Sequence, residues 1–413
     1  MTLQRFGELQ RMMADEAVSI RTATYKAELE NELREILKYW TDYAPDNING
    51  GFYGKIDNDN LVTADAPKGS VLNARILWTF SAAYNNSNNP GYLQMAERAY
   101  QYINTHIIDP EYGGVYWSVD YKGVPLDTKK QVYAIAFTTY ALSEYFIASG
   151  IEVVRQQAID LFYLLVEKAY DPINTGYFEA FTRNWKTIDD LRLSAKDANE
   201  KKTMNTHLHV LEGYTNLYRI WPDKALGEHI SMLLNNFFDH FIDPQTHHLI
   251  LFFDEEWSPK SQLVSYGHDI EATWLMLEAA EVIGDEKMIE SVKQISIGIA
   301  EATMKGLDTD GGLWYEYEPA DDHPVKEKHW WVQAEAMIGF FNAWQISGYK
   351  KYLELSINNW AFVKDKILDK TNGEWFWGVT HDGHIMENED KVGLWKCPYH
   401  NSRACIEIIK RIN

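Results

Sequence analysis

The hydrophobic and polar positions along the chain repeat with a helical period, in two alternating forms. Segments of the first form are apolar on almost every side, as in residues 71–83 and 133–142. Segments of the second form carry a single apolar stripe, as in residues 92–103 and 153–166. A helix that is apolar all round is buried, whereas a helix with one apolar stripe faces water on its other side. The pattern therefore predicts inner and outer helices in alternation.

A short turn motif separates successive helix pairs. In residues 108–120, Asp109 opens a polar turn, Gly114 follows, and a brief aromatic strand comes next. The motif recurs roughly every 60 to 70 residues. Its six aspartates are Asp46, Asp109, Asp171, Asp243, Asp308 and Asp369. A glycine ends five of the turns, and in the fourth His248 takes that position, where we expect it to be exposed to solvent.

The six repeats predict an all-α, closed architecture. No single helix pair could bury its own apolar face, so neighbouring pairs must stack on one another. Six pairs closed on themselves give an (α/α)6 barrel, or toroid, with the aromatic strands as short β-hairpins at one rim. Residues 25–40 add a further amphipathic helical pattern near the N-terminus. We expect residues 1–413 to form one (α/α)6-barrel domain.

The composition narrows the class of protein. A hydrophobic content of 46% with 24% charged residues is typical of a soluble globular protein. The net charge of −21 argues against nucleic acid or an anionic membrane as a partner. No secretory signal or membrane-spanning stretch is evident, so a cytoplasmic location is expected. The 15 Trp and 25 Tyr suit a sugar-binding surface, because flat rings stack on the apolar faces of pyranoses.

Polar or aromatic residues stand at the start of each predicted inner helix. Because all six starts share one phase of the repeat, closure of the ring brings them to the same end of the central axis. Residues far apart in the sequence should then line one pocket. The six starts are residues 68–75, 129–133, 204–209, 265–271, 329–335 and 395–403.

Helical spacing sorts these residues further. Residues three or four apart share a helix face, and the pairs are Asn205 with His209, His268 with Glu271, and Trp331 with Glu335. His207 lies about 200° around the helix from His209. Only one of these two histidines can face the pocket, and we favour His209.

The pocket residues are compatible with more than one chemistry. Histidine titrates near neutrality, and a pair of histidines suits proton transfer at a carbon next to a carbonyl, as in a ring-opened reducing sugar. Glycoside hydrolysis would instead need two carboxylates flanking the bond, for which Asp197, Glu271 and Glu335 are candidates. A metal site is disfavoured, because the His207–His209 pair faces two ways and neither a cysteine cluster nor an HExxH motif accompanies it. We expect no metal and no cofactor.

The inner-helix starts resemble those of the cellobiose 2-epimerase family, within the N-acylglucosamine 2-epimerase superfamily. The stretches that carry the resemblance are residues 68–80, 125–137, 196–214, 265–276, 328–336 and 390–405. The resemblance implies an (α/α)6 barrel and a cofactor-independent enzyme acting on a small-molecule disaccharide. Such an enzyme inverts C2 of the reducing-end glucose in β-1,4-linked disaccharides, converting cellobiose to glucosyl-mannose and lactose to epilactose. The alternative that the protein is an N-acylglucosamine 2-epimerase or an aldose–ketose isomerase of the same fold stays open. A monomer or weak homodimer is expected.

The resemblance also implies roles for individual residues. His268 and His400 would be the acid/base pair, one removing the C2 proton to leave a cis-enediolate and the other returning a proton to the opposite face. Arg75 would be the counter-charge to the developing oxyanion. The remaining implied contacts to the sugar or the enediolate are Tyr133, Asn205, His209 and Glu271, with stacking by Trp331 and Trp395 and with Asp197 holding the non-reducing unit.

Overall fold

The computed structural model describes the backbone of residues 3–412 and the side chains of residues 16–412, and this part of the chain is mostly helical. Its α-helices are α1 (Leu3–Asp42), α2 (Ser70–Ser87), α3 (Pro90–Tyr102), α4 (Val132–Ser149), α5 (Glu152–Lys168), α6 (Met204–Ile220), α7 (Lys224–Asn236), α8 (Tyr266–Ile283), α9 (Glu286–Thr303), α10 (Trp330–Ser347), α11 (Lys350–Phe362) and α12 (Tyr399–Arg411). Four short helical turns complete them: η1 (Ile103–Ile107), η2 (Phe237–Phe241), η3 (Met304–Gly306) and η4 (Val363–Ile367). None of the described helices has the length and apolar character needed to cross a bilayer.

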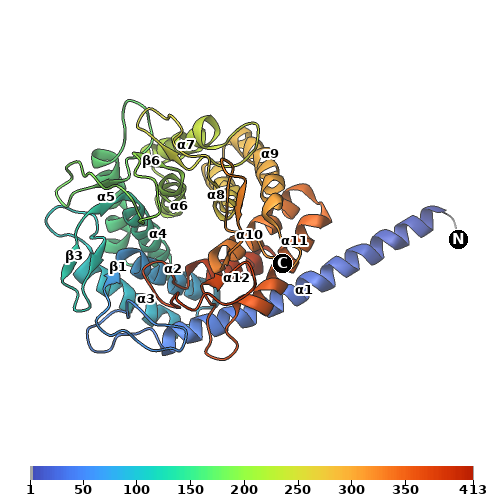
Figure 1. The fold of residues 1–413 in the computed structure, drawn as a ribbon, viewed down its shortest axis with the longest axis horizontal. Coiled ribbons are helices and arrows are strands. Elements are labelled where there is room, and N and C mark those ends of the chain that lie inside the picture. Colours follow the sequence, from blue (N-terminus) through green and yellow to red (C-terminus); the bar gives the residue numbers. More distant parts are fainter. Residues whose placement is uncertain (1–2, 413) are drawn as a thin grey trace.

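Helices of even number form an inner ring (Figure 1). Each contacts the next from α2 to α12, and α12 contacts α2, which closes the ring. The other helices lie outside: α3, α5, α7, α9 and α11 each pack on the inner helix before them, and α1 packs on α12. The inner helices are buried along most of their length, whereas an outer helix such as α3 buries only Ala96, Ala99 and Tyr102. This difference follows from the all-round and one-sided apolar patterns.

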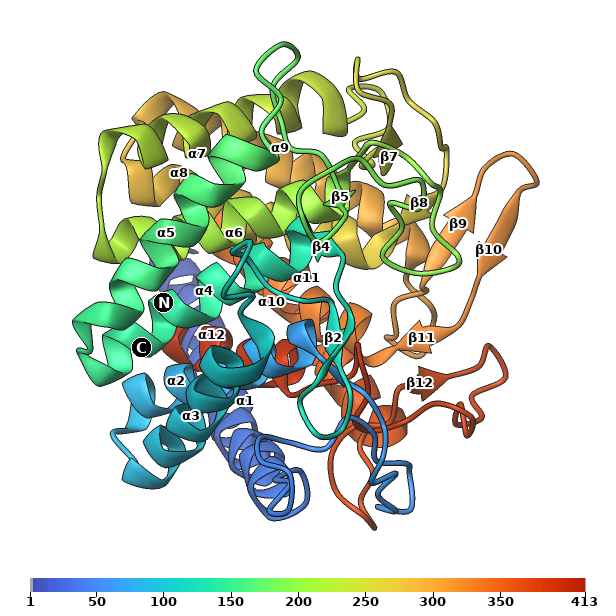
Figure 2. The ribbon, with the colours of Figure 1, turned by 90° about the vertical axis from the view of Figure 1, so that its left-hand side faces the viewer.

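Short strands lie at one end of the helical ring (Figure 2). They are β1 (Lys68–Gly69), β2 (Ser118–Val119), β3 (Pro125–Asp127), β4 (Lys130–Gln131), β5 (Ala180–Phe181), β6 (Lys202–Thr203), β7 (Phe252–Phe253), β8 (Val264–Ser265), β9 (Glu316–Glu318), β10 (His323–Val325), β11 (Lys328–His329) and β12 (Gly378–Val379). The predicted hairpins are present in β2–β3 and β9–β10, and as single antiparallel bridges within a repeat at Phe253–Pro259 and Val379–Ile385.

Most of the strand pairs instead join neighbouring repeats. The two residues before an inner helix pair with the aromatic strand of the following repeat, in the antiparallel pairs β1–β2, β4–β5, β6–β7, β8–β9 and β11–β12. A bridge between Ile56 and Val392 joins the first repeat to the last in the same way. The strands therefore fix where each inner helix begins, and with it the position of the residues at its start.

The repeated aspartate has two functions in its turn. In five of the six turns one carboxylate oxygen accepts hydrogen bonds from backbone N–H groups two and three residues later. A buried lysine just before the inner helix also binds the aspartate at 2.5–2.9 Å, in the pairs Lys68–Asp46, Lys130–Asp109, Lys202–Asp171, Lys328–Asp308 and Lys391–Asp369. Removing one partner would leave a buried charge unpaired, so these pairs hold each turn against its helix start.

The fourth turn is held against its inner helix by a histidine instead of a lysine. It contains no lysine pair, and His248 is not the solvent-exposed residue expected from the sequence. Its Nδ1 lies 2.7 Å from Oδ2 of Asp269 at the start of α8, and its side chain is only 11% exposed. The left-handed backbone conformation belongs to the preceding His247, at φ +61°. The expected exposure of His248 was wrong because its imidazole takes the place of the lysine and binds the turn to the start of the inner helix.

Candidate active site

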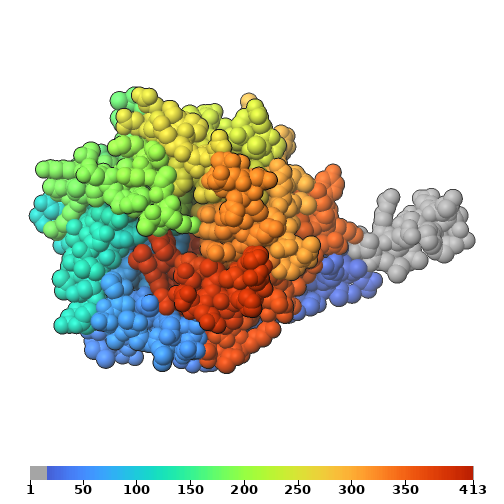
Figure 3. Space-filling view, viewed as in Figure 1, coloured from blue at the N-terminus to red at the C-terminus, as the bar shows by residue number. Residues whose placement is uncertain are grey.

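A cavity of about 610 Å³ lies at the strand-bearing end of the ring, among the starts of the inner helices. It opens as a hollow near the centre of the ring, between the green loop and the red C-terminal segment (Figure 3). Its volume is in the range of small-ligand sites. All ten site residues proposed from the sequence line it: Arg75, Tyr133, Asp197, Asn205, His209, His268, Glu271, Trp331, Trp395 and His400. The shared repeat phase accounts for the residues at the inner-helix starts, whereas Asp197 reaches the cavity from the irregular segment before α6.

His268 and His400 both pack against the Trp331 ring. The ring centroids of His268 and Trp331 are 4.8 Å apart, and those of His400 and Trp331 are 5.7 Å apart. Nδ1 of His268 is 2.8 Å from the hydroxyl of Ser265, and Nδ1 of His400 is 2.7 Å from Oε1 of Glu335. In both imidazoles Nδ1 is therefore engaged by the barrel wall, and Nε2 is the nitrogen available to a ligand.

Burial acts against the charged form of both histidines. Burial lowers the pKa of His268 well below its ordinary value of 6.5, and the nearby His209 and Lys196 act in the same direction. Burial also lowers the pKa of His400 well below 6.5, with further depression from the charges of Arg75 and Arg403. A neutral imidazole whose Nδ1–H is donated to a carboxylate carries a lone pair on Nε2. His400 is thus arranged as a base.

His209 has a similar carboxylate partner. Its Nδ1 lies 2.7 Å from Oε2 of Glu212, one helical turn further along α6, and its ring packs on Phe137 and Tyr133. His207 points the other way, as the helical phase predicts. It accepts a hydrogen bond from the backbone N–H of Tyr177 through Nε2 and donates through Nδ1 to the backbone carbonyl of Thr203, just before α6, so its role is structural.

Arg75 and Tyr133 form the cationic side of the cavity. The Arg75 guanidinium donates from Nη2 to the Tyr133 hydroxyl at 2.7 Å and stacks over Phe137 at 4.3 Å. Burial lowers the pKa of Arg75, but the neighbouring Tyr133 and other acidic groups outweigh it, so the net pKa is raised and the charge is fixed. Nε of Arg75, Oδ1 of Asn205 and Oε2 of Glu271 have no hydrogen-bond partner among the described residues.

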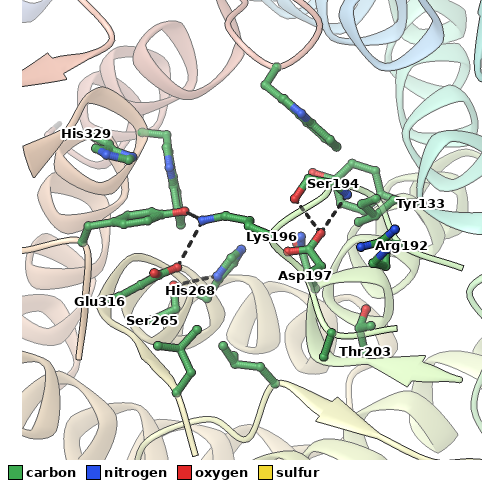
Figure 4. A pocket seen from close by; sticks show the side chains of 18 of the residues that line it. Tyr133, Arg192, Ser194, Lys196, Asp197, Thr203, Ser265, His268, Glu316 and His329 are labelled. Carbon is green, nitrogen blue, oxygen red and sulfur yellow. Dashed lines mark hydrogen bonds and ion pairs between the residues drawn. The ribbon is translucent and has the colours of Figure 1, made fainter. Parts of the chain in front are cut away.

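The long irregular segment from residue 184 to 202 forms one edge of the cavity mouth. Asp197 is on it, with Oδ2 accepting hydrogen bonds from the backbone and hydroxyl of Ser194. Figure 4 shows Lys196 extending across the cavity toward Glu316, near His268. Its Nζ lies 3.3 Å from Oε1 of Glu316 and also contacts the Tyr315 hydroxyl. The segment therefore reaches the opposite wall and narrows the entrance.

One group of side chains has the donor types of a metal site. Ligand atoms of Glu271, Glu335 and His400 lie within 4.8 Å of one another. The guanidinium of Arg403 already binds both carboxylates, at 2.8 Å from Glu271 and 2.6 Å from Glu335. A cation at this position would have to displace Arg403, so the geometry favours an ion-pair network over a metal centre.

Sequence reasoning missed the residues one helical turn below the cavity. Glu212 and Arg403 were not singled out, and Glu335 was considered only as a hydrolytic carboxylate. Two of these carry a local signal, because Glu212 follows His209 by three residues and Arg403 follows His400 by three. The contact between Glu335 and His400 spans 65 residues and arises only when the ring closes.

Tryptophans, histidines and a buried guanidinium thus line a cavity inside a ring of helices, as in a small-molecule enzyme site. Residues 50–404 match the family model described as N-acylglucosamine 2-epimerase (GlcNAc 2-epimerase), and the chain belongs to this family. It is an enzyme of the epimerase and isomerase class.

Relatives of high similarity cover nearly the whole chain. The chain is 48% identical to a cellobiose 2-epimerase of Bacteroides fragilis over 385 residues, covering 93% of this chain and 98% of the relative. It is 40% identical to a cellobiose 2-epimerase of Ruminococcus albus, again over 93% of this chain and 98% of the relative. The solved structure of cellobiose 2-epimerase from Bacillus thermoamylovorans superposes with a TM-score of 0.89 at 41% identity, covering 94% of this chain and all of that chain.

Proposed function

We propose that this protein inverts C2 of the reducing-end glucose in β-1,4-linked disaccharides, converting cellobiose to glucosyl-mannose and lactose to epilactose. The proposal includes the finer architecture, one (α/α)6-barrel catalytic domain. The observation that carries it is the pair of imidazoles, His268 and His400, that both contact Trp331 and have each Nδ1 engaged by the wall. Inversion at a carbon requires proton removal from one face and delivery to the other, and two separately held imidazoles supply this.

From their hydrogen bonds we assign a different proton-transfer role to each of the two histidines. Glu335 accepts from Nδ1–H of His400 and so leaves a basic Nε2, which would remove the C2 proton of the ring-opened glucosyl unit. The Ser265 hydroxyl can donate to or accept from Nδ1 of His268. His268 therefore keeps this contact in either protonation state, as a residue must if it gives a proton in one direction of a reversible reaction and takes one in the other.

The other cavity residues would bind the sugar and its cis-enediolate. Arg75, with its Tyr133 partner, would stabilise the oxyanion, because a fixed charge in a buried site needs little reorganisation as charge develops. Trp331 and Trp395 would stack on pyranose faces. Two further groups, His209 and Glu271, would contact the reacting unit with Asn205, and Asp197 on the long segment would hold the non-reducing unit.

Glycoside hydrolysis has less support. A hydrolase places its two carboxyl groups roughly 5 to 9.5 Å apart on either side of the bond. Carboxylate oxygens of Glu271 and Glu335 lie within 4.8 Å, and both groups bind the same guanidinium. They form one buried cluster rather than two groups that flank a substrate.

The proposal is tested by product analysis. The purified protein is incubated separately with cellobiose, lactose, N-acetylglucosamine and mannose, and the products are separated by anion-exchange chromatography. We expect glucosyl-mannose from cellobiose and epilactose from lactose, with no free glucose. Free glucose from cellobiose would indicate hydrolysis, and turnover of N-acetylglucosamine or mannose alone would assign the enzyme to another substrate of the family.

A further inference from the structure

Arg403 occupies the layer directly below the cavity. Its side chain is fully buried, with the guanidinium 4.2 Å from the Tyr399 ring centroid and 4.7 Å from that of Trp274. Nη2 donates to Oε1 of Glu335 at 2.6 Å and to Oε1 of Glu271 at 2.8 Å. Nη1 contacts Oε1 of Glu212 and the Tyr399 hydroxyl. One cation thus binds three carboxylates from three different inner helices.

Two of these carboxylates are the ones that hold pocket histidines. Oε1 of Glu335 accepts from both Arg403 and Nδ1 of His400. Glu212 divides its oxygens, with Oε1 toward Arg403 and Oε2 toward Nδ1 of His209. Arg403 is therefore linked to each imidazole through one intervening glutamate, Glu335 for His400 and Glu212 for His209. No other cation among the described residues makes these contacts.

The charge balance shows why a cation is needed here. Three buried carboxylates, Glu212, Glu271 and Glu335, lie near two buried guanidiniums, Arg75 and Arg403, so the cluster would carry one excess negative charge if all three were ionised and the histidines neutral. Like charges that share a buried site cannot all stay ionised, because burial and mutual repulsion both favour protonation. Burial and the neighbouring Glu335 already raise the pKa of Glu271 well above its ordinary value. Without Arg403 the carboxylates of Glu335 and Glu212 would lose their cationic partner.

Titratable and charged groups face this layer from all six inner helices and from the segment that precedes α12. They are Arg75 from α2, Tyr133 and Tyr140 from α4, His209 and Glu212 from α6, His268 and Glu271 from α8, Glu335 from α10, Tyr399, His400 and Arg403 from α12, and Lys396 and Cys397 before α12. Lys396 is already bound to Glu374 at 2.8 Å. Arg75 is turned to Tyr133, so neither cation can replace Arg403.

We infer that Arg403 is a positioning residue that binds Glu335 and Glu212 and keeps their carboxylates aimed at Nδ1 of His400 and His209. Its catalytic consequence rests on the proposed function, whereas its effect on the two imidazoles does not. Removing the cation should raise the proton affinity of both carboxylates and both histidines. The neutral, Nδ1-protonated form of each imidazole would then be lost at a higher pH than in the wild type.

The first test compares pH–rate profiles of wild type, Arg403→Met and Arg403→Lys. For Arg403→Met we expect kcat to fall at least 100-fold and the acidic limb of the profile to move up by about one pH unit or more, with little change in KM. For Arg403→Lys we expect a partial rescue, because an ammonium restores the charge but cannot donate to Glu335 and Glu212 along two fixed directions. The matched control is Arg98→Met, since Arg98 donates only to backbone carbonyls of an outer turn and should change stability alone.

The second test needs no activity. The ¹⁵N signals of selectively labelled histidine report tautomer and pKa in each variant. We expect two imidazoles to shift from the Nδ1–H form and to titrate at higher pH in Arg403→Met and, less strongly, in Arg403→Lys. Wild-type imidazole signals and a wild-type profile in a folded Arg403→Lys protein would overturn the inference, as would a lower melting temperature with an unchanged profile in Arg403→Met. If the wild type itself turns over no sugar, the proposed function fails, and the ¹⁵N titration still decides the role of Arg403.

Discussion

Replacing Glu335 by glutamine is the most informative single perturbation of the mechanism. The carboxylate is fully buried behind His400. Its Oε1 accepts from Nδ1 of His400 at 2.7 Å and from Arg403 at 2.6 Å, and its Oε2 accepts from Nε1 of Trp274 at 3.0 Å. All three partners are donors. Glutamine keeps the shape of the side chain but offers one acceptor oxygen and an NH₂ group that donates.

Either orientation of the amide is unfavourable. With the oxygen toward His400, the NH₂ faces the indole N–H of Trp274; with the orientation reversed, the NH₂ faces His400 and forces the imidazole into the other tautomer. Loss of a charge-assisted hydrogen bond costs about 1.5–3 kcal/mol, and a mispaired buried donor costs about 1–3 kcal/mol more. At about 1.4 kcal/mol for each factor of ten, these costs predict a kcat lower by roughly 10²–10⁴. KM should change little, because the side chain does not reach the substrate.

The assay is steady-state epimerisation of cellobiose, with the melting temperature measured in parallel. Glu32→Gln is a matched control, because Glu32 is also buried and also accepts an indole N–H, from Trp375 at 2.8 Å, but lies on α1 away from the cavity. We expect Glu32→Gln to keep the wild-type kcat even if it lowers stability. A Glu335→Gln enzyme with kcat within about threefold of wild type would refute the claim that the carboxylate prepares His400 as the base.

Two further predictions concern the other histidines. His268→Ala and His400→Ala should each abolish turnover while circular dichroism and melting temperature stay close to wild type, and epimerase rates near wild type in either variant would exclude the two-histidine mechanism. His207, which burial gives a pKa of about 3, binds a proton in the unfolded chain below about pH 6.5 but not in the fold. The stability it contributes is therefore present above pH 6.5 and is lost as the pH falls toward 3, by about 2 kcal/mol at pH 5. Urea unfolding of His207→Gln should show a shallower loss between pH 7 and 5, and an unchanged slope would contradict this.

Much of this fold could be predicted from the sequence because its helix pairs repeat. The all-round apolar pattern of residues 71–83 and the one-sided pattern of 92–103 separate the inner α2 from the outer α3 because burial acts directly on composition. The common phase of the inner-helix starts then places residues as distant as Arg75 and His400 in one cavity. His207 and His209 could be distinguished by helical phase alone.

The interactions that cross between helices could not be read in this way. Hairpins were expected, but most strands pair with the next repeat, since a two-residue strand gains its hydrogen bonds from whichever chain the ring places beside it. The pairing of Glu335 with His400 depends on the rotation of two separate helices. Exposure of His248 was predicted from its turn position, whereas its pairing with Asp269 requires the start of the following inner helix. In each case the deciding contact is made by a residue distant in sequence.

The central claim is proton transfer at C2, and it is tested most directly by proton NMR of the purified protein with cellobiose in D₂O. We expect a growing mannose-type reducing end that carries deuterium at C2, together with gradual loss of the C2 proton signal from the remaining glucose unit. Epimer formed with its C2 proton retained would contradict removal by one imidazole and return by another. Formation of free glucose in place of an epimer would contradict the account altogether.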